Sequence, residues 1–283
     1  MIDASEEAAR EPRLTVIEPT AASRLSDLRE FAEFRELLYT LARRDIKIRY
    51  KQTLIGATWA VIQPLLTMVV FTVVFSRIAH VSSGTKPYAV LVFVGLLPWQ
   101  LFAQSITRST MSLVTNTPLI SKIYFPRLII PVAALGSPLF DFVISLGVLA
   151  VLMAVYGVAP SWGLVALPAF LFLTLLASLG AGLWFSALNA RFRDVGYAIP
   201  FILQLGIYIS PVAYPISAVP HHLRLIFELN PIAELIQGFR WGLIGDSPPD
   251  GLMLAVGTIT ILVVLVSGLL YFGRTQRTFA DVI

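Results

Sequence analysis

The sequence contains no cysteine, few charged residues and no motif for binding a nucleotide phosphate. The lack of cysteine excludes disulfides, thiolate metal sites and a cysteine nucleophile. No glycine-rich loop ends in Gly-Lys-Ser or Gly-Lys-Thr, so the chain has no P-loop for ATP. The three histidines, His80, His221 and His222, lack the spacing of metal ligands, and no nucleophile elbow or zinc motif is present. These absences argue against an enzyme and against a metal site.

Charged residues make up only 13% of the 283 residues, whereas hydrophobic residues make up 57%. A soluble domain is about one-half apolar and one-quarter charged. Mean hydropathy is +0.78, and a water-soluble fold could not bury that much apolar surface. The formal charge of +4 does not indicate nucleic acid, because the basic residues follow a membrane topology. We therefore predict an integral membrane protein with one membrane domain.

Six apolar segments are long enough to cross a membrane, which takes about 20 residues of helix. They predict an all-α protein with six transmembrane helices within residues 57–283. The third segment is interrupted by Pro131 and Pro138, so its first turns are expected to lie along the interface. The predicted spans are 57–75, 88–106, part of 128–156, 163–188, 195–214 and 252–272.

An amphipathic stretch precedes the first span, within residues 28–56. Apolar residues such as Phe34 and Leu41 recur with helical spacing, and basic residues such as Arg43 lie between them. We expect a helix in the membrane interface, with its basic residues near anionic headgroups. An ordinary surface helix is the alternative. Residues 1–27 begin with an acidic, polar stretch without a signal peptide, and we expect a flexible cytoplasmic tail.

A shorter apolar run, 232–244, lies between the fifth and sixth spans and carries Glu234 and Arg240. It is too short to cross the membrane and predicts a re-entrant or interfacial helix. Residues 216–229 predict a second short helix before it. Asn230 and Pro231 supply a cap and a first-turn proline. Together these segments predict a helical hairpin that dips into one face.

Lysine and arginine gather in the amino-terminal region and in the connections on the same side of the membrane. The opposite side has only Arg77, Lys86, Arg224 and Arg240. By the positive-inside rule, both termini are cytoplasmic and the hairpin faces outward.

Asp141 is the one strongly charged residue well inside a predicted span. Such residues are costly and often functional. A proton-coupled transporter would usually have several. Two roles remain: a structural bond to a neighbouring helix or to the interface, and contact with a substrate or gate.

Four residues of the fifth span, Tyr197, Phe201, Gln204 and Tyr208, fall within a stripe about 60° wide on a helix. Sugars bind such surfaces, because rings stack on their C–H faces and amides bond hydroxyl groups. Trp59 and Gln63 repeat the pairing in the first span. The alternative is that these side chains serve packing or anchor the helices at the interface.

The connection 117–127 is expected on the cytoplasmic side, as a short helix bounded by prolines. A plain loop would not normally expose Ile123, Tyr124 and Phe125. Either the membrane surface or another subunit, such as a cytoplasmic ATPase, is expected to cover them.

Four groups of residues, in this order and with this topology, resemble the type 2 ATP-binding-cassette permeases that export O-antigen, capsule and teichoic-acid polymers in bacteria. The resemblance covers about residue 37 to the end. Its motifs are RDIKIRYK (44–51) followed by LIGATW (54–59), FRDV (192–195), SPVAYP (210–215), and Asn230-Pro231 with Phe239-Arg240.

The resemblance implies a homodimer of six-span subunits that encloses a channel in the bacterial plasma (inner) membrane. It also implies two copies of a separate cytoplasmic ATPase, which bind ATP and Mg, so that this chain binds no cofactor. The substrate would be a lipid-linked polysaccharide. Contacts that pass movement from the ATPase to the membrane would involve Arg44, Lys47, Lys122, Tyr124 and Phe125.

The resemblance also implies that the first and fifth spans line the translocation path, with Trp59, Gln63, Tyr197, Phe201, Gln204 and Tyr208 as sugar contacts. The outer hairpin, with Glu234 and Arg240, would help to gate the exit. Arg193 and Asp194 lie at the cytoplasmic mouth. They either bind a pyrophosphate or pair with each other and cap the next helix, and the second role is favoured.

Three other functions are alternatives to the export of a polysaccharide. An exporter of drugs or small lipids often has a large outer domain between its first two spans, whereas residues 76–87 form a short connection. An ion-coupled secondary transporter would show inverted repeats and intramembrane carboxylates. A membrane-embedded glycosyltransferase would need acidic residues at an aqueous edge.

Overall fold

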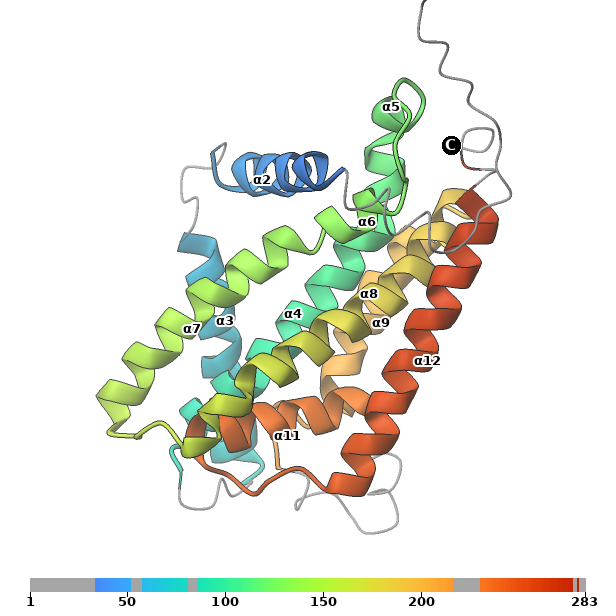
Figure 1. Cartoon of the computed structure of the whole chain (residues 1–283). Coiled ribbons are helices and arrows are strands. Elements are labelled where there is room, and N and C mark those ends of the chain that lie inside the picture. Colours follow the sequence, from blue (N-terminus) through green and yellow to red (C-terminus); the bar gives the residue numbers. More distant parts are fainter. Residues whose placement is uncertain (1–33, 52–57, 81–85, 216–229, 277–278, 280–283) are drawn as a thin grey trace, which may run out of the picture.

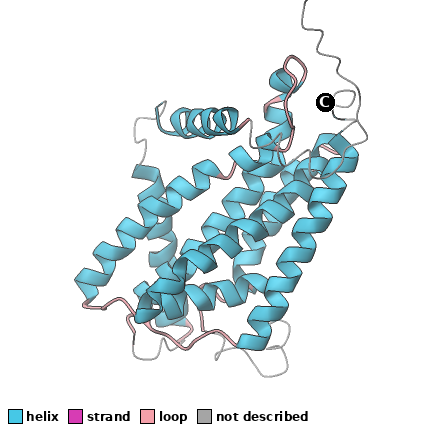
Figure 2. Ribbon diagram, viewed as in Figure 1, coloured by secondary structure: helices cyan, strands magenta, loops and turns pink. Residues whose placement is uncertain are grey.

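The computed structural model describes residues 34–51, 58–80, 86–215, 230–276 and 279. Within these ranges every regular element is a helix, and the helices are joined by loops and turns (Figure 2). The predicted all-α class is confirmed for this part of the chain. The predicted tail, 1–27, lies outside the described residues, and the interface region, 28–56, is described only in part.

Long helices run side by side through the molecule, and a helix lies across each end of this bundle (Figure 1). Helix α2 crosses one end, called here the α2 end, and α11 crosses the other, called the α11 end. The elements are α2 (Arg35–Lys51), α3 (Thr58–Phe71), the π-helix η1 (Thr72–Ile78), α4 (Tyr88–Thr115), α5 (Thr117–Ile120), α6 (Ile129–Ala133), α7 (Gly136–Tyr156), the 3-10 helix η2 (Trp162–Ala166), α8 (Leu167–Arg191), α9 (Val195–Ile209), α11 (Pro231–Ile244) and α12 (Gly251–Thr275).

Helix α4 is the centre of the packing. It contacts α3, α7, α8, α9 and α11, and most of it is buried, unlike the other long helices. Helices α8 and α12 approach closely because Gly180 and Gly268 face each other: a Cβ on Gly268 would lie 2.6 Å from the Gly180 carbonyl oxygen. Beside this contact, Trp184 stacks on Tyr271 with ring centroids 4.3 Å apart. Small residues at a crossing let two membrane helices pack backbone to backbone.

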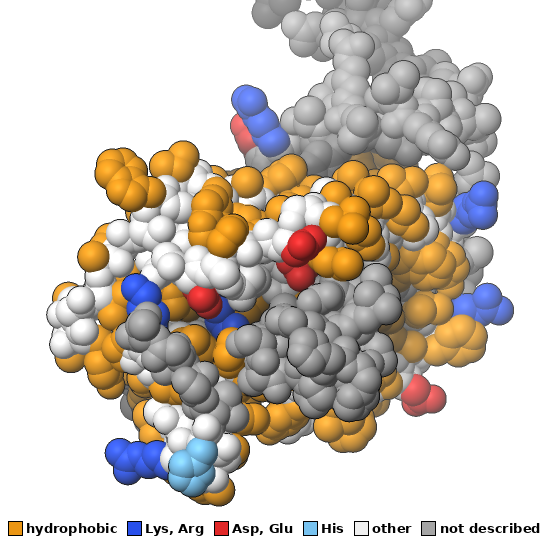
Figure 3. All heavy atoms as spheres, turned by 90° about the horizontal axis from the view of Figure 1, so that it is seen from below, with side chains coloured by type: hydrophobic (Ala, Val, Ile, Leu, Met, Phe, Trp, Pro, Cys, Tyr) orange, Lys and Arg blue, Asp and Glu red, His pale blue; other side chains and the backbone are white. Residues whose placement is uncertain are grey.

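Five helical segments are long and apolar enough to cross a membrane: Thr58–Ile78, Tyr88–Thr115, Ile129–Tyr156, Trp162–Arg191 and Gly251–Thr275. They correspond to the predicted first, second, third, fourth and sixth spans. The break between α6 and α7 lies between Pro131 and Pro138, where the sequence predicts an interruption. Apolar side chains also cover much of the surface seen from the α11 end (Figure 3). The chain is a multi-pass membrane protein.

The predicted fifth span is shorter than expected. Helix α9 ends at Ile209, not at residue 214, and its 15 residues extend about 22 Å, less than the roughly 30 Å of a hydrocarbon core. The helix ends because Ser210 precedes Pro211 and adopts an extended conformation (φ −90°, ψ 143°). The count of six full-length spans is therefore not reproduced in the described residues.

The second arm of the predicted hairpin is present as α11. Its first residue is Pro231, and Asn230 Oδ1 accepts a hydrogen bond from the Ile232 amide at 3.1 Å, so the predicted cap is confirmed. The helix stops at Gly245, whose positive φ of 69° suits glycine. The first arm, 216–229, lies outside the described residues, and the hairpin itself stays a prediction.

Candidate functional site

The aromatic stripe of α9 lies on an uncovered face of the protein. Tyr197 is 80% exposed, and Phe201, Gln204 and Tyr208 are also exposed. The face behind the stripe packs on the core through Gly196 and Ile199. These four side chains are therefore not part of the buried core.

Trp59 and Gln63 of α3 are likewise exposed. Helices α3 and α9 both pack on α4, so that α4 lies behind them. Toward the α11 end they meet through Phe71 and Tyr208, whose ring centroids are 6.0 Å apart. The six predicted substrate contacts therefore lie on two neighbouring helices, α3 and α9, which form one wall in front of α4. Their side chains are exposed on the surface of the protein.

The backbone is not helical directly after α9, and a buried arginine binds this irregular segment. Arg240 of α11 is fully buried, and its guanidinium donates to the carbonyl oxygens of Val212 (2.8 Å) and Tyr214 (3.2 Å). The Tyr88 hydroxyl donates to the Ala213 carbonyl oxygen between them. Irregular backbone at membrane depth must be satisfied by the protein, since lipid offers no partners. These side chains supply the partners.

Gly95 permits this arrangement. A Cβ at this position of α4 would lie 2.7 Å from the Val212 carbonyl oxygen and 3.2 Å from Arg240 Nη2. Sequence reasoning missed Gly95 and Tyr88, because only the fold brings them beside residues 210–215. The expected part of Glu234 and Arg240 in a gate at the exit stays a prediction. In this structure both side chains are buried, and Arg240 binds the backbone of residues 212 and 214.

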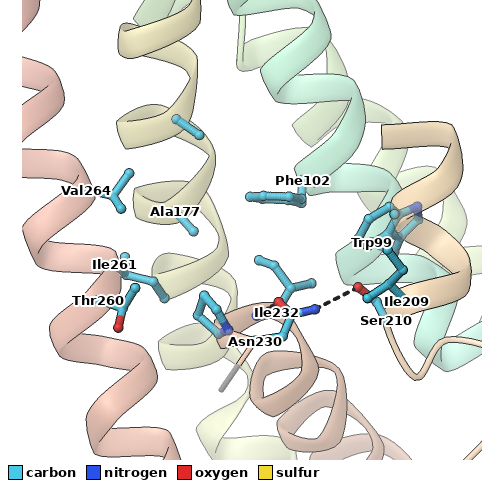
Figure 4. A pocket seen from close by; sticks show the side chains of 13 residues that line it. Trp99, Phe102, Ala177, Ile209, Ser210, Asn230, Ile232, Thr260, Ile261 and Val264 are labelled. Carbon is cyan, nitrogen blue, oxygen red and sulfur yellow. Dashed lines mark hydrogen bonds between the residues drawn. The ribbon is translucent and has the colours of Figure 1, made fainter. Parts of the chain in front are cut away.

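A cavity of about 300 Å³ lies where α4, α8, α9, α11 and α12 meet (Figure 4). Trp99 lies on one side, with Ile261 and Val264 opposite. At its edge, Asn230 Nδ2 donates to Ser210 Oγ at 3.1 Å, so these polar groups are already bonded. The cavity suits an apolar group, and none of the predicted substrate contacts lines it.

Helix α2 is fastened to the bundle by an ion pair. Arg49 Nη1 lies 2.7 Å from Asp141 Oδ2 of α7, and it also donates to Gln104 of α4 at 3.3 Å. The Tyr50 hydroxyl donates to the other Asp141 oxygen. Burial and, second, the bond to Asp141 raise the pKa of Tyr50 above its usual value, so its hydroxyl stays protonated and able to donate. Of the two roles considered for Asp141, the bond to a neighbouring helix agrees with the structure.

Two further contacts fix α2. Gly136, at the start of α7, lies under Ala42: a Cβ on the glycine would be 2.9 Å from the alanine Cβ. Arg44 donates to Asn116, at the end of α4, at 2.7 Å, and to Asp45 at 2.9 Å. Arg44 is therefore bonded within the chain, whereas Lys47 is exposed.

The connection between α5 and α6 has one exposed and one buried part. Helix α5 covers only Thr117–Ile120 of the predicted 117–127 helix. Lys122 and Ile123 are exposed and Tyr124 is 71% exposed, as expected for a docking surface. Phe125 is only 5% exposed and packs in an apolar cluster with Leu41, Leu113 and Ile129. The expectation that Phe125 contacts another subunit is wrong, because its own chain covers it.

Arg193 and Asp194 are both exposed, in the turn between α8 and α9. In the part of the chain that the structure describes, they form no ion pair with each other. Asp194 stands at the N-cap position of α9 without a side-chain cap bond. The favoured structural role is therefore not seen. No group of three metal-ligating side chains was found among the described residues.

The family model described as ABC-2 type transporter matches residues 36–244. The O-antigen export system permease protein RfbA of Klebsiella pneumoniae is 29% identical over 252 residues, which cover 88% of this chain and 95% of that protein. RfbA of Myxococcus xanthus is 27% identical over 257 residues, covering 90% and 98%.

A second group of relatives is named for a different cargo. The polysialic acid transport protein KpsM of Escherichia coli is 23% identical over 239 residues, which cover 83% of this chain and 91% of that protein. Both groups match along nearly the whole of their own length.

Proposed function

The chain belongs to the ABC-2 type transporter family, and from that premise we propose that it is the permease of an exporter for a lipid-linked polysaccharide. The similarity to O-antigen and polysialic acid transport proteins supports this class of cargo. A permease performs no bond-making chemistry. ATP hydrolysis belongs to a separate ATPase subunit, in keeping with the lack of a P-loop in this sequence.

One observation carries the proposal: two amide side chains, Gln63 and Gln204, lie on uncovered faces of membrane helices. An amide that faces lipid has no hydrogen-bonding partner and is costly. The amides are instead flanked by the exposed rings of Trp59, Phe201 and Tyr208. A surface of amides and rings suits a sugar chain that moves past it, with water in the path.

A second copy of the chain would complete this path. Helices α3 and α9 contribute one wall, and a closed channel needs an equivalent wall opposite. In this arrangement the α2 end faces the cytoplasm and the bacterial inner membrane holds the dimer. Exposed Lys47, Lys122 and Tyr124 would contact the ATPase, two copies of which would serve the dimer. Membrane lipids surround the remaining apolar surface.

The test is reconstitution of the permease and its ATPase in liposomes with a panel of lipid-linked glycans. ATP-dependent movement of a glycan to the opposite leaflet is the expected result. The same assay with a small-lipid or drug cargo tests the alternative exporter. If only such a cargo moves, the polysaccharide assignment is wrong while the family assignment stands.

A further inference from the structure

Among the described residues, helices α2, α4 and α7 bring together three arginines and two carboxylates, and one of these arginines has no carboxylate of its own. Arg44 pairs with Asp45 at 2.9 Å, and Arg49 pairs with Asp141 at 2.7 Å. Arg108 of α4 lies one helical turn after Gln104, the residue to which Arg49 donates at 3.3 Å, so both arginines meet the same side of α4. Arg108 also interacts electrostatically with both aspartates and with Arg49. Across residues 34–51, 58–80, 86–215, 230–276 and 279, Arg108 forms neither an ion pair nor a hydrogen bond. The cluster therefore has an excess of one positive charge.

The position of Arg108 makes this excess costly. It is partly buried and lies seven residues before the end of α4 at Thr115, so its Cα is about 10 Å below that end. Arginine does not lose its proton in proteins, and it therefore stays charged. A like charge on Arg49 beside it raises the free energy further. A bound anion would lower it.

We propose that Arg108, together with Arg49, binds the phosphate of a lipid headgroup at the α2 end of the bundle. The planar guanidinium fork matches phosphate oxygens in a bidentate way. Arg49 uses Nη1 for Asp141 and Gln104, which leaves its other N–H groups available. Asp141 holds Arg49 in position. It also neutralises one positive charge, so that the cluster keeps a single excess charge, which one phosphate group can balance.

The lipid that carries the transported glycan is the expected source of this phosphate, and that part rests on the proposed function. The headgroup would then enter at the level of helix α2, beside the wall formed by α3 and α9. Arg193 and Asp194, the other candidates for binding a pyrophosphate, lie in an exposed turn, whereas Arg49 and Arg108 are partly buried.

The test is equilibrium binding of a labelled polyprenyl pyrophosphate to the permease and ATPase complex in phosphatidylcholine nanodiscs, without ATP. Arg108→Gln should lower the affinity about tenfold or more, the value of a charged hydrogen bond or better. Arg108→Lys should recover part of it, because the charge remains but the fork is lost. Arg43→Gln is the matched control: it removes a charge from the exposed face of α2 and should change affinity less than about twofold.

Equal affinity of wild type and Arg108→Gln would overturn the site, and so would an equal loss in Arg43→Gln. If Arg108→Gln does not assemble with the ATPase, Arg108→Lys decides: unchanged affinity in that variant overturns the site. Competition separates the sources of phosphate. Displacement by equimolar phosphatidylglycerol, or by inorganic phosphate, would keep the phosphate site and overturn the transported lipid as its ligand. Arg108-dependent binding without any export would refute the proposed function and leave the site standing.

Discussion

Arg49, near the end of α2, forms an ion pair with Asp141 inside α7, with 2.7 Å between guanidinium nitrogen and carboxylate oxygen. The pair joins the helix that lies across the bundle to one that runs through it. A movement of α2 would therefore be passed to α7 through this ion pair. Asp141 is the one strongly charged residue well inside a predicted span, and this contact neutralises its charge.

A double-mutant cycle measures the strength of the pair. Arg49→Gln and Asp141→Asn should show a coupling energy of about 0.5–3 kcal/mol, because the two groups are mostly buried and in contact. The measurement is reversible unfolding in detergent micelles. Arg43→Gln combined with Asp141→Asn is the control and should be additive, since Arg43 is exposed. Additivity in the first cycle would show that the ion pair does not stabilise the protein.

The same pair should matter for energy coupling. Asp141→Asn is expected to leave the ATPase bound while export per ATP hydrolysed falls, because α2 then moves without α7. Parallel assays of ATP hydrolysis and glycan export in liposomes check this. An unchanged ratio of export to hydrolysis would contradict the role.

Gly95→Ala should destabilise the protein by about 1–3 kcal/mol, because the new methyl group collides with the Val212 carbonyl and with Arg240. Arg240→Ala should cost at least about 2 kcal/mol, since it leaves buried carbonyls unsatisfied. Thermal unfolding in detergent measures both. Gly147→Ala is the control: no atom lies within 4 Å of the added methyl group, and helix α7 should gain about 0.4–1 kcal/mol.

The stripe on α9 is tested by Tyr197→Ala, Phe201→Ala and Tyr208→Ala together. Export should fall about tenfold or more, given the worth of each aromatic contact, while the complex with the ATPase still assembles. Ile259→Ala, Val263→Ala and Val266→Ala on α12 are the control, because these side chains are also exposed but entirely apolar. An equal loss in both triple variants would indicate a general defect, and the stripe would then have no special role.

Variants in the connection after α5 can distinguish residues that bind the ATPase from residues that stabilise the fold. Ile123→Asp with Tyr124→Asp should release the ATPase on co-purification and leave the permease folded, because both side chains are exposed. Phe125→Ala should instead lower stability by about 3–5 kcal/mol, as for other buried aromatic residues. A stable complex with the double aspartate variant would show that the ATPase binds elsewhere.

Local sequence patterns were enough to predict the membrane class, the positions of the long helices and α11. Hydropathy and helix capping depend on residues that are close in sequence. Uncharged runs and pairs such as Asn230 and Pro231 can therefore be recognised without knowledge of the fold. The sequence also placed Tyr197, Phe201, Gln204 and Tyr208 on one helix face, because helical periodicity fixes that face whatever the fold. That this face stays uncovered was decided by the tertiary structure.

The neighbours of each polar or aromatic side chain could not be predicted from the sequence and became known from the folded structure. Tyr124 and Phe125 are adjacent, yet one is exposed and the other is buried against Leu41 and Ile129, residues distant in sequence. Asp141 and Arg240 could be recognised as unusual charges, but their partners come from α2 and from residues 210–215. Burial and charge compensation depend on packing between distant segments, and a local pattern carries no information on which segments meet.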